Sequence, residues 1–313
     1  MTVHPIVERL ATTVVGRRRE AEVLVAALDA DRHVLLEGPP GTGKSTLLRV
    51  IAAELGVGFE FVEGNAELTP ARLVGHFDPA RVLAEGYDPR VFVDGPLVAA
   101  LRGGALLYLE ELNRVPEETL NVLVTVMSEH ELTVPRLGRI DAAPGFRLVA
   151  AMNPYDAVGT ARISSTIYDR LCRLSVDYQS DVEEQAIVRR SLGQPTLAGG
   201  GADGALDDHW LARAVDVVRR TRVHPEIRVG SSVRGAIDMS AVARSLADVR
   251  GASPDEVSLD AALVALSGRI RLREGSDRTT EDVITEIWRS VFGGDVGGAT
   301  GKAAAPAGAV QPG

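Results

Sequence analysis

The run Gly38-Pro39-Pro40-Gly41-Thr42-Gly43-Lys44-Ser45 follows the pattern G-x-x-x-x-G-K-[ST]. The apolar segment 33–37 precedes it, and residues 45–55 carry apolar side chains at helical spacing. A glycine-rich loop between a buried strand and a helix is the context in which this pattern binds phosphate. The alternative is a glycine-rich turn that binds nothing, and the full motif in this context argues against it.

Each residue type in this loop has a chemical role in holding a nucleotide. The glycines let backbone N–H groups converge on phosphate oxygens, and the helix dipole favours their negative charge. Lys44 would neutralise the β and γ phosphates, and the Ser45 hydroxyl can ligate Mg²⁺. The predicted nucleotide-binding residues of the loop are Gly38, Pro39, Pro40, Gly41, Thr42, Gly43, Lys44, Ser45 and Thr46.

Length and charge limit the classes of protein that this chain can represent. Its 313 residues suffice for two domains, and its formal net charge of −9 argues against a broad nucleic-acid footprint. The sequence contains neither an apolar run of the roughly 18 to 20 residues that cross a bilayer nor an N-terminal export signal. We therefore expect a soluble, cytoplasmic protein for which nucleic acid is a minority interpretation.

The cysteine and the histidines predict neither a disulfide nor a metal site. Cys172 is the single cysteine, and its place in the segment 171–176 favours a core position in a strand over a reactive thiol. The six histidines form no cluster with the spacing of metal ligands. We expect no zinc site.

Apolar strand-like segments recur along the first part of the chain, with helical patterns between most of them. This alternation predicts an α/β fold with a mainly parallel sheet covered on both faces. We expect a nucleotide-binding domain over 1–180, an all-helical domain over 181–292 and a disordered tail over 293–313, with a flexible break near 193–204. The predicted strands are 34–36, 59–62, 106–109, 148–152 and 171–176, and the predicted helices include 17–30, 206–221, 232–249, 258–272 and 280–292.

A second chemical signal is the apolar segment 106–109, which ends in Glu110 and Glu111. At the end of a strand beside the phosphate-binding loop, Glu110 can hold Mg²⁺ through its water shell, and Glu111 can orient and polarise an attacking water. The alternative is a solvated acidic turn before the next helix. We predict metal binding by Ser45 and Glu110 and a catalytic role for Glu111.

Several ordered motifs resemble those of the AAA+ ATPases, and within them the MoxR subfamily, over about residues 10 to 290. Val14-Val15-Gly16 resembles the entry to the adenine pocket, so Val15 and Gly16 join the predicted nucleotide-binding residues. Glu111-Leu112-Asn113-Arg114 resembles the Glu-Ile-Asn-Arg signature, and Met152-Asn153-Pro154 the sensor-1 Asn-Pro. The family usually has Asp where this chain has Glu110, which reaches one methylene farther. The resemblance implies ATP and Mg²⁺ as cofactors.

The same resemblance implies three further catalytic residues. Asn153 would contact the lytic water or the γ-phosphate, the alternative being an Asn-Pro turn cap. Arg170, in Tyr168-Asp169-Arg170-Leu171, resembles the arginine finger that enters a neighbouring subunit's site; the alternatives are a surface ion pair or Arg162 as the finger. Arg234, in the segment 230–234, resembles sensor 2 of the lid domain, or is a plain helix-start arginine.

Two insertions point to the subfamily. Residues 75–96 resemble the helix-2 insert, a hairpin directed toward the pore of a ring, and residues 131–138 resemble the presensor hairpin. Ordinary surface hairpins are the alternative. Phe77 and Arg81 are our first candidates for pore contacts.

The resemblance as a whole implies a homo-oligomeric ring, expected to be hexameric, that hydrolyses ATP and acts as a chaperone. It would remodel or activate a client protein together with a partner that carries a von Willebrand factor A domain. Two alternatives stay open: a nucleic-acid-dependent AAA+ motor, and an ATP-gated scaffold with little turnover.

Overall fold

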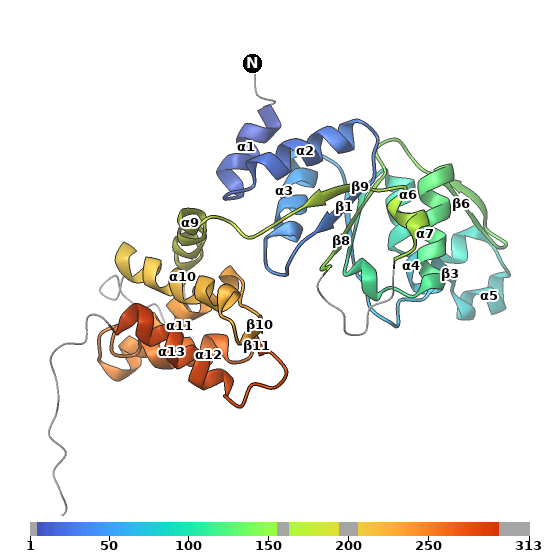
Figure 1. Cartoon of the computed structure of the whole chain (residues 1–313). Helices are drawn as coiled ribbons and strands as arrows, with labels where there is room; N and C mark the ends of the chain where they lie inside the picture. The colour runs from blue at the N-terminus through green and yellow to red at the C-terminus, as the bar shows by residue number, and fades with distance from the viewer. Residues whose placement is uncertain (1–4, 155–162, 194–205, 294–313) are drawn as a thin grey trace, which may run out of the picture. The chain divides into compact units, whose positions relative to one another are not determined.

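The computed structural model describes residues 5–154, 163–193 and 206–293 (Figure 1). It divides into two compact units, residues 1–187 and 188–313. Arg162, most of the predicted break at 193–204 and the tail after Gly293 lie outside the described residues. No helix within the described ranges is both long enough and apolar enough to cross a membrane.

The first unit is built on a five-stranded sheet in which all strand pairs are parallel. The strand order is β2-β5-β8-β1-β9, so β8 lies between the strand that precedes the glycine-rich loop and the strand that ends in the two carboxylates. The five segments predicted as strands all form strands, and the α/β prediction is confirmed. Their bounds are β1 (Val34–Glu37), β2 (Phe59–Glu63), β5 (Leu106–Glu110), β8 (Arg147–Met152) and β9 (Cys172–Ser175).

Helices cover both faces of this sheet. Successive strand residues point to opposite faces, and apolar residues on both faces need helices to pack against. Leu35 packs in one apolar cluster, while Val34 and Leu36 pack in the other. The cluster of Val34 and Leu36 is closed by α1 (Pro5–Thr13), α2 (Arg18–Asp29) and α3 (Lys44–Leu55). The cluster of Leu35 is closed by α4 (Pro70–Val74), α6 (Pro96–Gly103) and α7 (Glu117–Glu129), as Figure 1 shows for α6 and α7.

Both predicted insertions contain antiparallel strand pairs. The first pairs β3 (Gly75–Phe77) with β4 (Phe92–Asp94) and carries α5 (Pro79–Glu85) and the turn η1 (Pro89–Val91) between them. Phe77 packs edge-on against Tyr87 and Phe92, with ring centroids 5.2 and 5.1 Å away, and Arg81 pairs with Glu85. The second insertion pairs β6 (Glu131–Val134) with β7 (Gly138–Asp141), so the hairpin ends at Asp141 and not at the predicted residue 138.

The second unit is mainly helical but contains a short strand pair that the sequence did not predict. Its helices are α10 (Asp208–Val223), α11 (Val233–Arg250), α12 (Ser258–Leu266) and α13 (Thr280–Phe292), preceded by α9 (Asp181–Leu192) at the unit boundary. The prediction of an all-helical domain is wrong, because β10 (Ile227–Val229) pairs antiparallel with β11 (Arg271–Leu272). Accordingly α12 ends at Leu266 and not at the predicted residue 272. Strands of two or three residues are too short to show a period.

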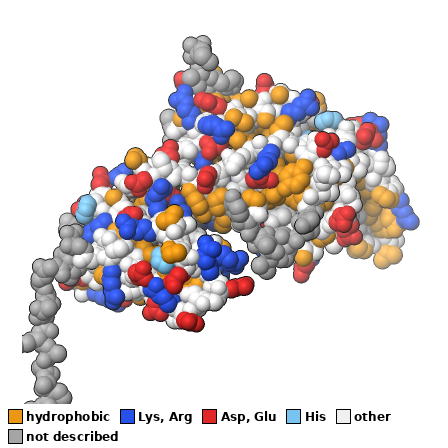
Figure 2. All heavy atoms as spheres, viewed as in Figure 1, with side chains coloured by type: hydrophobic (Ala, Val, Ile, Leu, Met, Phe, Trp, Pro, Cys, Tyr) orange, Lys and Arg blue, Asp and Glu red, His pale blue; other side chains and the backbone are white. Residues whose placement is uncertain are grey.

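The predicted core position of Cys172 is also wrong. Cys172 lies in a strand as predicted and is the first residue of β9, but its side chain is exposed. The reason is topological, since β9 is an edge strand in which only Leu174 is buried. On the face drawn in Figure 2, basic and acidic side chains are interspersed over both units.

Candidate functional site

The glycine-rich loop connects β1 to α3, and its glycines have structural reasons. Gly43, the residue before α3, has φ of +83°, in the left-handed region that glycine adopts without strain. A Cβ at Gly38 would lie 1.8 Å from the backbone oxygen of Val176, so a side chain has no room there. The loop therefore approaches the neighbouring backbone closely and turns sharply into the helix.

Lys44 is folded back over this loop and is 7% exposed. Its Nζ donates to the carbonyl oxygens of Gly38 at 3.0 Å and Pro39 at 2.8 Å. These acceptors are neutral carbonyls, with which an ammonium bonds less strongly than with a phosphate oxygen. A phosphate bound by the loop would therefore compete effectively for the Lys44 side chain.

Ser45 and Glu110 are 65 residues apart in the sequence and meet in the structure. The Ser45 hydroxyl lies 3.2 Å from each carboxylate oxygen of Glu110, and 3.5 Å from the hydroxyl of the buried Tyr108. Burial is the main cause that raises the pKa of Tyr108 above its ordinary value, so this hydroxyl stays protonated. A serine hydroxyl beside a carboxylate supplies the hard oxygen ligands that Mg²⁺ prefers, and the pair fits the predicted metal.

Glu111 follows β5 in an unusual backbone conformation. Its φ of 57° is left-handed, which is strained for a residue with a side chain. Its carboxylate forms an ion pair with Arg114 in the turn η2 (Leu112–Arg114). The backbone of Glu111 packs closely against Gly64, which has no side chain. A Cβ at Gly64 would lie 2.5 Å from the Glu111 carbonyl oxygen. The strained turn thus directs Glu110 and Glu111 differently.

Asn153 directly follows β8 and is half-buried. The preceding Met152 is paired in register with Glu37, the last residue of β1. Because the strands are parallel, the glycine-rich loop, Asn153 and the two glutamates all lie at the carboxyl ends of neighbouring strands. Ligands of open α/β sheets bind at this edge. The structure brings these predicted residues to one edge of the sheet, which we call the carboxyl edge.

Arg17 also belongs to this region, although the sequence did not single it out. It is 3% exposed, and its Nε and Nη2 donate to the Thr42 carbonyl oxygen at 3.1 and 2.9 Å. It also pairs with Glu20 at 2.8 Å. The preceding Gly16 has φ of +67°. In the sequence Arg17 opens an Arg-Arg-Arg run, which is typical of a solvated surface and hides its structural role.

Arg170 lies at the opposite edge of the sheet, where the strands begin, which we call the amino edge. It lies two residues before Cys172, the first residue of β9, which is paired with Val34, the first residue of β1. Its Nε donates to the Ser128 hydroxyl at 2.5 Å, and its Nη1 to the Thr166 carbonyl oxygen at 2.7 Å. Within the described residues it pairs with no carboxylate, so the predicted alternative of a surface ion pair is not seen there.

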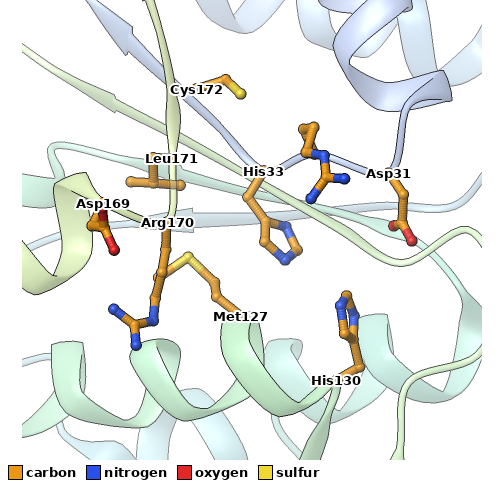
Figure 3. Close-up of a pocket in the computed structure, with 9 residues that line it drawn as sticks. Asp31, His33, Met127, His130, Asp169, Arg170, Leu171 and Cys172 are labelled. Atoms are coloured by element: carbon orange, nitrogen blue, oxygen red, sulfur yellow. The ribbon is translucent and has the colours of Figure 1, made fainter.

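A cavity of about 300 Å³ lies beside Arg170 at this amino edge (Figure 3). His33, Met127 and His130 line it together with Arg170. The His33 Nδ1 accepts from the backbone N–H of Leu148 at 3.0 Å, and burial, followed by the charge of His130, lowers the pKa of His33 to about 4. His33 is therefore neutral near pH 7.

Arg234 occupies the first turn of α11 and is exposed. Ser232 is the residue before this helix, and its side chain makes no capping hydrogen bond. Arg234 belongs to the second unit, whereas the residues of the carboxyl edge belong to the first. Its sensor-2 role stays a prediction.

A protein family and individual known proteins are similar to this chain. The AAA domain (dynein-related subfamily) matches residues 33–171. An uncharacterized protein of Staphylococcus epidermidis is 30% identical over 221 residues, which cover 70% of this chain and 80% of that protein.

Two solved structures share the fold. A Cytophaga hutchinsonii protein, provisionally described as an ATPase, has a TM-score of 0.51 at 20% identity, covering 91% of this chain and 93% of that one. A RuvB mutant of Thermotoga maritima has a TM-score of 0.54 at 21% identity, covering 80% of this chain and 70% of that one. At these identities the likeness establishes the fold alone.

Proposed function

We propose, on the premise that this chain belongs to the AAA domain family (dynein-related subfamily), that it binds ATP with Mg²⁺ at the carboxyl edge and hydrolyses it. The observation that carries the proposal is the meeting of Ser45 and Glu110 at 3.2 Å beside the buried Lys44. A loop that merely turned from strand to helix would need neither the buried cation nor the carboxylate facing its hydroxyl.

The residues of the carboxyl edge divide the work. Lys44 and the backbone N–H groups of the loop hold the phosphates, and Ser45 and Glu110 hold the metal, which supplies charge neutralisation when bound. Glu111 polarises the attacking water, and Asn153 orients it. Val15 and Gly16 line the entry to the adenine site. The Glu111 carboxylate would share its acceptor sites between Arg114, which contacts its Oε2, and the water.

The active site is completed between subunits of a homo-oligomeric ring, which we propose to be a hexamer. Arg170 is the arginine finger and serves the neighbouring subunit. Its place at the amino edge, with neutral hydrogen-bond partners, supports this role, since no carboxylate among the described residues holds the guanidinium back. Arg234 is the sensor-2 residue, contributed by the second unit acting as a lid.

The biological task that we propose is that of a MoxR-like chaperone, which remodels or activates a client protein with a von Willebrand factor A domain partner. The motif resemblance and the two strand-pair insertions support it. A nucleic-acid motor is less well supported, because the net charge is −9 and the likeness to RuvB concerns the fold. A Glu111→Gln form, which should hold ATP without turnover, is the form with which to identify the client by co-purification.

The test is an ATPase assay of the purified chain across a Mg²⁺ titration, with and without added DNA or RNA. Lys44→Ala should raise the Kd for ATP by roughly a hundredfold or more, because it removes charge-assisted hydrogen bonds to phosphate. Lys302→Ala, a substitution of the chain's other lysine, is the control and should leave the Kd unchanged. Equal ATP affinity of both variants would contradict the proposal, and turnover that depends on nucleic acid would favour a motor.

A further inference from the structure

We propose that Ser128 is the positioning residue of Arg170: its hydroxyl fixes the direction in which the guanidinium is presented to the neighbouring subunit. This inference rests on the proposed function of Arg170 as the arginine finger. Ser128 lies in the last turn of α7, 42 residues before Arg170 in the sequence, and no motif contains it.

Two hydrogen bonds define the orientation of Arg170. Its Nε donates to the Ser128 hydroxyl and its Nη1 to the Thr166 carbonyl oxygen. A guanidinium has five N–H donors in one plane, so two fixed bonds set the plane and leave the other donors for a phosphate. The arrangement presents a charged group without neutralising it.

Of the two partners, Ser128 fixes Arg170 to the rest of the unit. Thr166 is four residues before Arg170 in the same segment, so its carbonyl moves together with Arg170. Ser128 belongs to α7, whose Leu120, Leu123 and Val126 are buried in the core cluster. The Ser128 hydroxyl also donates to the Val124 carbonyl oxygen at 3.0 Å, which turns its lone pairs toward Arg170. Losing Ser128 would leave the Arg170 side chain held only by a carbonyl of its own segment.

Helix α7 also gives Ser128 a functional location. It begins shortly after Glu111 and η2 at the carboxyl edge, and it ends next to His130, whose ring centroid lies 6.0 Å from that of His33 at the amino edge. Its 13 residues span about 20 Å at 1.5 Å per residue. One rigid element therefore carries both the approach to the subunit's own nucleotide and the support of the finger offered to its neighbour.

The chain offers a matched control for this claim. Thr125 lies three residues before Ser128 on α7, is exposed as Ser128 is, and donates to the carbonyl oxygen four residues earlier, that of Asn121, at 3.4 Å. Its described contacts do not include Arg170. Ser128→Ala and Thr125→Ala remove the same kind of helical hydroxyl bond, and only the first removes the support of Arg170.

Steady-state ATPase assays should show kcat of Ser128→Ala reduced roughly ten- to hundred-and-fifty-fold, the value of a hydrogen bond to a charged group, with KM and ATP affinity within about twofold. Ser128→Thr keeps an acceptor oxygen and should recover most of kcat. Thr125→Ala should match the unmodified chain. A kcat of Ser128→Ala equal to that of Thr125→Ala, or no rescue by threonine, overturns the inference.

Mixed assemblies separate a finger defect from a general structural one. Ser128→Ala subunits mixed with Lys44→Ala subunits should regain activity, because the latter supply intact fingers to intact loops. Mixed with Arg170→Ala subunits they should not, because both lack a working finger. The reverse pattern would place the defect in the nucleotide site of Ser128→Ala itself and refute the inference. If Arg170→Ala alone keeps full activity, the proposed finger fails and the inference with it; if only Ser128→Ala keeps it, the inference alone fails.

Discussion

The carboxyl and amino edges of one sheet differ in how their charged groups are satisfied. At the carboxyl edge, side chains distant in sequence meet one another: Ser45 faces Glu110, and Lys44 lies over its own loop. At the amino edge, Arg170 is held by a hydroxyl and a carbonyl. The first edge holds the groups with which we propose that one chain binds phosphate and metal, while the second presents a cation that forms no ion pair with a carboxylate of the described residues. A site divided between two copies of the chain accounts for both.

The distance between the edges supports this division. Val34 and Glu37, the ends of β1, are separated by three strand steps, or roughly 10 Å, and the glycine-rich loop begins beyond Glu37. Arg170 precedes Cys172, which is paired with Val34, so it lies beyond the amino end of β1. Its side chain is hydrogen-bonded to Ser128 near the end of α7. A phosphate contact requires about 2.8 Å. In the conformation described, Arg170 does not reach the loop of its own chain.

Removal of the Arg170 side chain from the amino edge should have the largest effect. In GTPases an arginine finger contributes about 10³ to 10⁵ in rate. Arg170→Ala should therefore keep ATP affinity and lose turnover by a factor approaching that range, as measured by single-turnover hydrolysis. Arg18→Ala, which removes an exposed arginine paired with Glu22, is the control and should be unchanged. If Arg170→Ala kept substantial turnover, Arg170 would not belong to the active site.

Glu111→Gln tests the carboxyl edge with the next largest effect. The change keeps the shape of the side chain and removes the charge that polarises water, so kcat should fall by about 10² to 10⁴. ATP binding, measured by titration with a fluorescent analogue, should survive. A parallel loss of binding and turnover would mean that Glu111 and its pair with Arg114 are structural.

Glu110→Asp tests the length of the side chain at the proposed metal site. The Glu110 carboxylate already lies 3.2 Å from the Ser45 hydroxyl, so shortening the side chain should withdraw it by about one bond length and reduce kcat several-fold, an effect that added Mg²⁺ partly restores. Glu110→Gln should be more severe and insensitive to Mg²⁺. Full activity of Glu110→Gln across the titration would exclude a metal role for this residue.

Tyr108→Phe should have the smallest effect. It removes one buried hydroxyl, 3.5 Å from Ser45, without changing the ring that packs against Phe59 and Phe61. We expect the Mg²⁺ concentration for half-maximal activity to rise a few-fold, with thermal stability nearly unchanged. An unchanged Mg²⁺ dependence would show that Ser45 and Glu110 orient each other without Tyr108.

The residues of the carboxyl edge could be predicted from the sequence because each belongs to a local sequence pattern. The loop motif, the apolar run before Glu110 and Glu111, and the Asn-Pro after β8 each sit at the end of a strand, and parallel pairing brings strand ends together. Long apolar strands such as β5 and β8 are also strong signals. The five strands and the α/β class were predicted for this reason.

The remaining features depend on partners that no local pattern reveals. Arg17 looks like surface charge and is buried because the carbonyl of Thr42 lies beside it. No sequence pattern distinguishes Ser128 from other helical serines, and only the structure shows its hydrogen bond with Arg170. Cys172 is exposed because β9 is an edge strand, and β10 and β11 are too short to have a period. In each case the tertiary neighbour, and not the residue itself, decides the outcome.

The most direct test of the divided site is to mix Lys44→Ala subunits with Arg170→Ala subunits and measure ATP hydrolysis. Each variant alone should be nearly inactive. Mixed assemblies should regain part of the activity, because some interfaces pair the intact loop of the Arg170→Ala chain with the intact finger of the Lys44→Ala chain. If the subunits demonstrably exchange and mixed assemblies form, yet activity stays at the level of either variant alone, the claim that Arg170 acts on a neighbouring subunit is refuted.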